Sequence, residues 1–112
     1  MPKITLNPAP TFKGVVSIPV PGEKPAEVEF VFKHRTRKQF DELMKKTKAD
    51  VEAGTDGAGD TAFVMSLVEG WNVDGEPFNA ENVEKLLENY HAAGRAISER
   101  YTELLVLGRL GN

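Results

Sequence analysis

Two segments near the amino terminus alternate between apolar and polar residues, and this period of two constrains the fold more than any other feature of the chain. One face of residues 12–20 carries Phe12, Gly14, Val16, Ile18 and Val20. One face of the second segment carries Val28, Phe30 and Phe32. Such alternation is typical of β-strands with one buried side, and the intervening Pro-Gly-Glu-Lys-Pro of 21–25 is composed of turn-forming residues. We therefore expect an antiparallel β-hairpin over residues 12–35, with Pro19 at a sheet edge because proline cannot donate to a ladder.

The period changes after residue 35, which indicates helices. Thr36 and Gln39 match a capping box, in which each side chain bonds the backbone amide of the other residue. The apolar positions that follow recur at intervals of three and four, and we expect them to form one buried stripe. They are Phe40, Leu43, Met44, Thr47 and Val51. The glycine-rich residues 54–59 predict a flexible break.

We expect a short second helix from an N-cap at Asp60 to Gly70, followed by a loop or short extended piece over residues 71–77. Asn79 is the N-cap expected for a third helix, in which Val83, Leu86, Leu87 and Tyr90 line one side. A last helix follows and ends near Gly108. Its apolar positions are Ala93, Ile97, Tyr101, Leu104 and Leu105.

These patterns predict an α+β fold, with an N-terminal antiparallel β-hairpin followed by a bundle of about four helices. With 112 residues, the chain has the usual size of one domain. We interpret residues 1–112 as a single domain with an extended arm over 1–11, the hairpin over 12–35 and the helical part over 36–108.

Composition argues against several functional classes. There are no cysteines, and the two histidines, His34 and His91, fall in different elements without a metal-ligand spacing. We therefore expect no catalytic residues, no cofactor and no metal, so the chain is not predicted to be an enzyme. No run approaches the roughly 20 apolar residues of a membrane span, and no signal peptide is evident near Met1. The formal net charge of −3 makes nucleic acid an unfavoured partner.

Residues 33–38 form the one local basic patch, with the sequence Lys-His-Arg-Thr-Arg-Lys. A solvated strand end balanced by Asp41 and Glu42 is the ordinary interpretation. Cations at the start of a helix are mildly unfavourable, however, which leaves a functional role open. A small nucleic-acid-binding regulator that uses this patch is the alternative hypothesis.

The carboxyl-terminal helix offers the best candidate for a partner-binding surface. Leu104-Leu105-Val106-Leu107 places apolar groups all around a helix, more than one face can bury in a small domain. We expect partner contacts at Tyr101, Leu104 and Leu107, and also around Trp71, which otherwise closes one end of the core. Because some of this surface is expected to meet another chain, we also expect a homo-oligomer.

Three stretches carry a resemblance to a known family. They are FKHRTRKQFDELM (32–44), VEGWNVDGEPFNAENVEKLLENY (68–90) and AISERYTELL (96–105). Over residues 12–107 the chain resembles the tail assembly chaperones of long-tailed bacteriophages, although His91 stands where many members have proline. The resemblance implies a non-enzymatic late protein of the phage or prophage, working in the host cytoplasm. It also implies that the protein binds the tape measure protein, keeps it soluble and helps recruit tail tube subunits.

Overall fold

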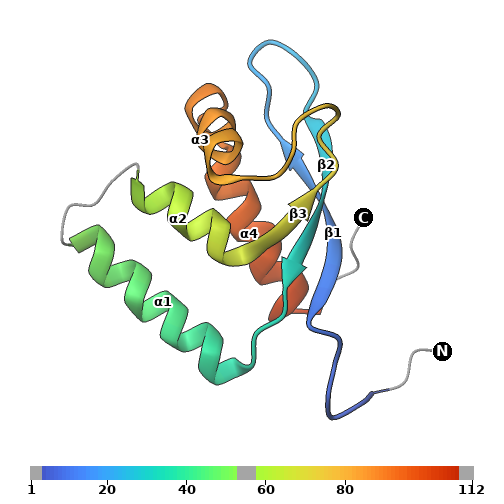
Figure 1. Ribbon diagram of the computed structural model, residues 1–112, viewed down its shortest axis with the longest axis vertical. Helices are drawn as coiled ribbons and strands as arrows, with labels where there is room; N and C mark the ends of the chain where they lie inside the picture. The colour runs from blue at the N-terminus through green and yellow to red at the C-terminus, as the bar shows by residue number, and fades with distance from the viewer. Residues whose placement is uncertain (1–3, 53–57, 109–112) are drawn as a thin grey trace.

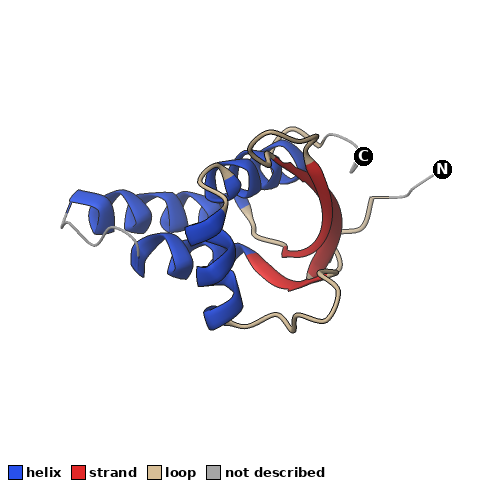
Figure 2. Cartoon of the chain, turned by 90° about the horizontal axis from the view of Figure 1, so that it is seen from above, coloured by secondary structure: helices blue, strands red, loops and turns tan. Residues whose placement is uncertain are grey.

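The structure, a computed structural model, describes residues 4–52 and 58–108, which form a curved sheet with helices on one side (Figures 1 and 2). The elements in chain order are β1 Thr11–Ile18, β2 Ala26–Lys33, α1 Arg37–Glu52, α2 Ala58–Leu67, β3 Val68–Trp71, α3 Ala80–Asn89 and α4 Ala93–Leu105. The predicted fold class, α+β with an amino-terminal antiparallel hairpin followed by helices, is confirmed.

The hairpin joins β1 and β2 in an antiparallel register that places apolar residues opposite one another. Phe12 pairs with Phe32, and Val16 pairs with Val28. Opposed side chains on one face of a sheet pack together, so this register gathers the apolar residues of both strands on the core side. β1 ends at Ile18, immediately before Pro19, and is an edge strand of the β1-β2-β3 sheet, as the proline predicts.

A third strand, β3, lies where the sequence predicted the end of a helix. Residues 68–71 pair antiparallel with β2, with Phe30 opposite Trp71, and a bulge offsets the ladder beside Val31. Asn72 extends this pairing, since its amide donates to the Glu29 carbonyl at 3.1 Å and its side-chain oxygen accepts from the Glu29 amide at 2.8 Å. The predicted helix to Gly70 was wrong at this end because the free edge of β2 offers the backbone a better partner than local propensity could indicate.

The capping box at α1 is confirmed. The Thr36 amide donates to the Gln39 side chain at 2.9 Å, and the Gln39 amide donates to the Thr36 hydroxyl at 3.1 Å. The predicted stripe is less buried than expected, because Phe40, Leu43 and the described side chains after them are only half-buried. α1 packs mainly against α2 at the outside of the helical layer (Figure 1), and only its first turn also meets α4, through the rings of Phe40 and Tyr101.

The predicted break at 54–59 lies largely outside the described residues. Because α2 begins at Ala58, Gly59 and Asp60 are inside the helix, and Asp60 is not the N-cap that the sequence predicted. Helix ends differ by a residue or two between criteria, so the predicted position was wrong by only a small margin.

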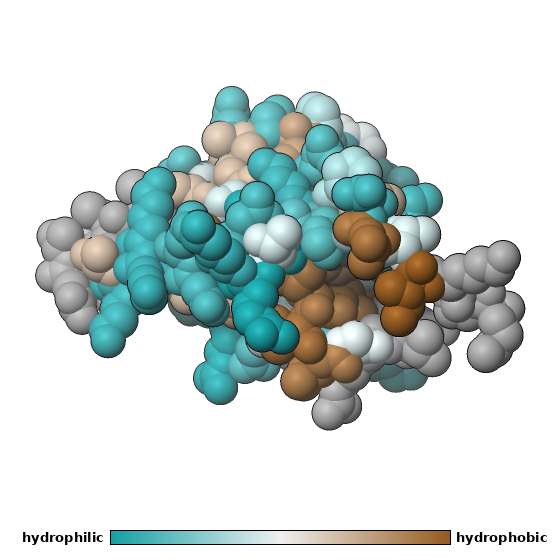
Figure 3. All heavy atoms as spheres, turned by 90° about the horizontal axis from the view of Figure 1, so that it is seen from below, coloured by the Kyte–Doolittle hydropathy of each residue, from teal (hydrophilic) through white to brown (hydrophobic). Residues whose placement is uncertain are grey.

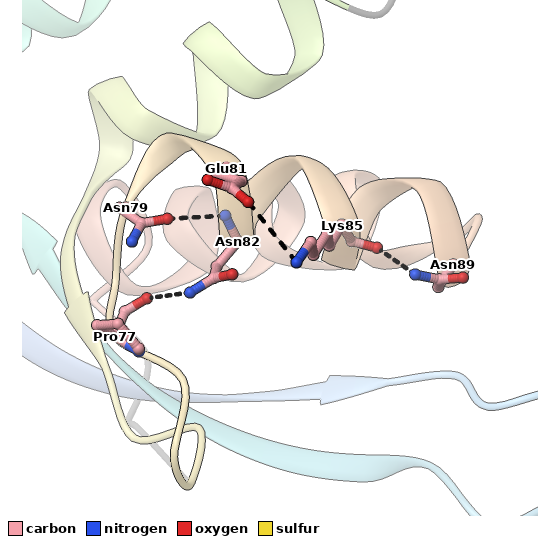
Figure 4. Close-up of polar contacts among 6 residues, drawn as sticks. All are labelled: Pro77, Asn79, Glu81, Asn82, Lys85 and Asn89. Carbon is pink, nitrogen blue, oxygen red and sulfur yellow. Dashed lines mark hydrogen bonds and ion pairs between the residues drawn. The ribbon is translucent and has the colours of Figure 1, made fainter.

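The start of α3 is fixed by side chains that satisfy its free backbone amides (Figure 4). Asn79 is the N-cap, as predicted, and its side chain accepts from the Asn82 amide at 2.8 Å. The side chain of Asn82 in turn donates to the Pro77 carbonyl at 2.8 Å, which ties the preceding loop to the first turn. Glu81 and Lys85 form an exposed ion pair of 3.7 Å along the helix. This local network explains how a polar sequence sets the direction of α3.

α4 supplies the inner face of the helical layer. Its residues Ala93, Ile97 and Tyr101 are buried, as the helical spacing predicts. They pack with apolar side chains from the sheet, α2 and α3. The buried core also includes Val16, Ile18, Phe30, Phe32, Val64, Leu67, Val68 and Val83. α4 packs closely on β1 at Gly14, where Leu104 occupies the space that a side chain on residue 14 would need.

Replacing Gly14 with alanine is expected to destabilise the protein by about 1–3 kcal/mol, the usual cost of overpacking. The added methyl group would overlap Leu104 Cδ1 and come within 3.1 Å of Phe32 Cε2. Urea denaturation measures the loss. Gly70→Ala is the matched control, because its methyl group would meet only Val31 atoms at 3.9 and 4.0 Å.

The double variant Gly14→Ala/Leu104→Ala separates steric overlap from other effects. Removing the leucine side chain opens room for the new methyl group, so the two substitutions should cost less together than the sum of their separate costs. Additive costs would mean that Leu104 does not pack on Gly14.

Candidate partner-binding surface

Tyr101, one of the predicted contact residues, is an internal anchor of α4. Its side chain is only 1% exposed, and its hydroxyl donates to the Lys33 carbonyl at 2.7 Å and accepts from Arg35 Nη1 at 3.2 Å. Its ring lies 5.5 Å from that of Phe32 and 6.3 Å from that of Phe40, measured between centroids. Because both ring and hydroxyl are occupied, Tyr101 does not belong to the exposed surface where the sequence placed it.

Trp71 closes one end of the core. Its half-buried ring packs edge-on against Phe78, with centroids 5.3 Å apart, and against Phe30 at 6.2 Å. The indole Nε1 donates to the Glu76 carbonyl at 2.7 Å, so its polar atom is satisfied by the turn that follows β3. The tryptophan therefore joins the sheet to the loop before α3, and only part of its ring is available to a partner.

The end of α4 changes from buried to exposed within one turn. Leu104 is half-buried over Gly14, whereas Val106 and Leu107 are 54% and 61% exposed. α4 ends at Leu105, and the chain beyond it leaves the core. Of the four predicted contact residues, Leu107 is thus the one that the structure places openly at the surface.

Two further apolar residues lie on the segment before β1. Ile4 and Leu6 are 97% and 94% exposed. In the ribbon view this segment and the end of α4 lie at the same, lower end of the molecule (Figure 1). Seen from below, apolar side chains gather on one part of the surface (Figure 3). We call Ile4, Leu6, Val106 and Leu107 the apolar face; they are the exposed large hydrophobic residues of the described chain. Ile4 and Leu6 were not among the predicted contact residues, although apolar residues in a proline-rich arm that cannot form a helix are a usable signal.

The basic patch 33–38 divides into inward and outward cations. Lys33 Nζ donates to the Met65 carbonyl at 3.3 Å, and Arg35 donates to Tyr101, so these two side chains are used inside the fold. Arg37 and Lys38, in the first turn of α1, are exposed and take part in no ion pair with the described residues. Since two of its cations serve the fold, the patch offers fewer charges to a nucleic acid than the sequence indicated.

The two histidines line separate grooves. His34 borders a groove with Arg35 and Glu42, and His91 borders another with Leu87 and Arg95. Within residues 4–52 and 58–108, no group of three or more His, Asp or Glu side chains is arranged to hold a metal ion. The same residues contain no helix that is long and apolar enough to span a membrane.

The described residues thus have a well-packed core, an exposed apolar face and exposed cations at the start of α1. The family model for phage tail assembly chaperones matches residues 1–112, the whole chain, and the chain therefore belongs to that family. No curated protein and no solved structure is significantly similar to it. Membership supports a chaperone role in tail assembly, suggests that this role is non-enzymatic, and implies phage tail proteins as partners.

The buried hydroxyl of Tyr101 should make stability depend on alkaline pH. Burial raises the pKa of Tyr101 above 10.0, and Arg35 opposes this shift by favouring the phenolate. Since the folded state holds the proton more tightly than the unfolded state, the contribution is complete below the unfolded pKa and is lost as pH rises through the folded pKa.

Tyr101→Phe tests this linkage. The variant should be less stable at neutral pH by about 1–3 kcal/mol, because the Lys33 carbonyl and Arg35 lose their buried partner. As pH rises above about 10, the usual pKa of tyrosine, the wild type should however lose more stability than the variant. Chemical denaturation at several pH values measures both effects. Parallel losses in the two proteins over this range would contradict the assignment.

Proposed function

We propose that this protein binds the tape measure protein through the apolar face and keeps it soluble in the host cytoplasm during tail assembly. The observation that carries the proposal is the exposure of Val106 and Leu107, at 54% and 61%, together with the exposure of Ile4 and Leu6. Apolar side chains exposed in a contiguous group are typical of interaction sites. A tape measure protein is expected to be a long, apolar and largely helical rod, which needs such a cover to avoid self-association.

The size of the face suits a contact that must later be released. Complete burial of an exposed Val or Leu side chain contributes about 1.5–3 kcal/mol, and part of the gain is offset by lost motional freedom on association. A few such side chains give modest affinity per molecule. Many copies along one rod would together cover its apolar surface, and each could leave as tube subunits arrive.

Recruitment of tail tube subunits is the second part of the proposal and rests on family membership. The half-buried Trp71 end of the domain is the proposed site for it, because this end presents an aromatic side chain and is built from elements other than those of the apolar face. Self-association into a homo-oligomer stays a prediction.

Coexpression tests the proposed function. The tape measure protein of the same phage genome should be soluble with the wild-type chain and should aggregate with Val106→Ser/Leu107→Ser. Removing two half-exposed apolar side chains is expected to weaken binding by about tenfold or more. The soluble fraction and the co-purified complex are the measurements.

The control is Ala49→Ser/Ala62→Ser, which introduces the same number of serines at exposed helix positions outside the apolar face. It should behave as the wild type, and thermal unfolding should show that both variants are folded. If the tape measure protein is equally soluble with and without the wild-type chain, the proposed function fails.

A further inference from the structure

The contacts of Tyr101 place the basic segment 33–38 against the last turns of α4, the helix that leads to Val106 and Leu107 in the apolar face. The Tyr101 hydroxyl is bonded to the Lys33 carbonyl and to Arg35, one helical turn before Leu105. On the other side, the His34 amide donates to the Pro10 carbonyl at 2.8 Å, which holds the segment against the end of the amino-terminal arm. Hydrophilic side chains border the apolar ones in the space-filling view of this face (Figure 3).

The charged residues of the basic segment itself are all of one sign. Residues 33–38 contain Lys and Arg at four of six positions and no acidic residue, although the whole chain has a net charge of −3. Residues 4–10 carry no charge at all. In the last turn of α4, Glu103 lies 3.6 Å from Arg100 of its own chain.

Arg37 and Lys38 are placed where the helix itself disfavours them. Backbone amides give the start of α1 a partial positive charge, so cations there are slightly destabilising. Asp41 and Glu42 follow one turn later but form no ion pair with either residue in the described structure. Two exposed cations at an unfavourable site next to an apolar surface are explained by a partner that supplies the opposite charge.

We propose that the apolar face takes an amphipathic helix whose apolar stripe is flanked by acidic side chains, with these carboxylates meeting Arg37 and Lys38. This inference rests on the proposed function and specifies the segment of the partner that is bound. Apolar contacts supply the affinity, as in other helix-in-groove complexes. The cations select the acidic segment and fix the direction in which it lies.

A second copy of the chain fits this surface less well. It would bring another Arg37 and Lys38 to the contact together with Asp41 and Glu42, and so offers no excess of acidic over basic side chains. Elsewhere, the described chain exposes no large apolar residue that could dock on this face in a head-to-tail contact. A different polypeptide, with acidic side chains beside an apolar stripe, is therefore the occupant that we propose for this face.

Two fluorescent helical peptides test the inference. Both carry an apolar stripe of leucines at positions i, i+3, i+4 and i+7, and they differ only in the residues beside the stripe, which are glutamate in one peptide and lysine in the other. At 0.1 M salt, where the Debye length is about 10 Å, the wild type should bind the glutamate peptide about three- to tenfold more tightly than the lysine peptide. The preference should shrink at 1 M salt, where that length is about 3 Å. Fluorescence anisotropy gives both dissociation constants.

Arg37→Glu/Lys38→Glu should reverse this preference. Its stability should change little, because acidic residues at the start of a helix are favourable and offset repulsion from Asp41 and Glu42. Lys24→Glu/Lys48→Glu is the matched control, since it makes the same change in net charge at exposed positions outside the segment and should leave the preference intact.

Equal binding of the two peptides, binding of neither, or a preference unchanged in Arg37→Glu/Lys38→Glu would overturn the inference. Binding of duplex DNA by the wild type, lost in that variant, would also overturn it and assign the segment to nucleic acid. The proposed function stands in any of these cases if the tape measure protein still depends on Val106 and Leu107 for solubility.

Discussion

The arrangement of this domain depends on how one side chain, Tyr101, is held. Its hydroxyl bonds the end of β2 at Lys33 and receives Arg35, while its ring packs among Phe12, Phe32 and Phe40. A buried tyrosine contributes apolar contact through its ring, and the hydrogen bonds of its hydroxyl fix the orientation of the side chain. This single side chain therefore connects α4 to both strands of the hairpin and to the start of α1.

That anchor also decides where the surface becomes apolar. Because Tyr101 and Leu104 fix α4 against the sheet, the chain reaches its last helical residue, Leu105, at the margin of the core. Val106 and Leu107 follow with nothing in the described structure to bury them. The same hydroxyl bond holds the basic segment 33–38 nearby, so an apolar surface and a group of cations adjoin for one structural reason. In the proposed function, this small face bordered by charge would cover a helix of the partner and later release it.

Family membership and physical structure support different parts of this account. The match over residues 1–112 shows that the chain belongs to the phage tail assembly chaperone family. The resemblance carried by residues 68–90 and 96–105 indicated the same family. The residues behind that resemblance have a structural role, since Asn79 caps α3 and Trp71 closes the core. The residues that carry the family resemblance thus stabilise the fold. The proposed contacts with the tape measure protein lie on other residues, which are exposed at the surface.

The strands and helices that are marked by residues close together in the chain could be predicted from the amino-acid sequence. Alternation gave the hairpin, the Thr36 and Gln39 pair gave the start of α1, Asn79 gave the start of α3, and helical spacing gave the buried face of α4. Local signals suffice there because each bond joins residues close in the chain or in register across a turn.

Features that depend on residues far apart in the sequence became visible only in the folded structure. β3 forms because β2 has a free edge, and Tyr101 is internal because Lys33 and Arg35 reach it from across the domain. The exposed residues Ile4 and Leu6 precede β1 and the exposed residues Val106 and Leu107 follow α4, and only the fold brings these two segments to the same end of the molecule (Figure 1). A periodic pattern marks which residues are apolar, but burial depends on what packs against them, and that is a property of the whole fold.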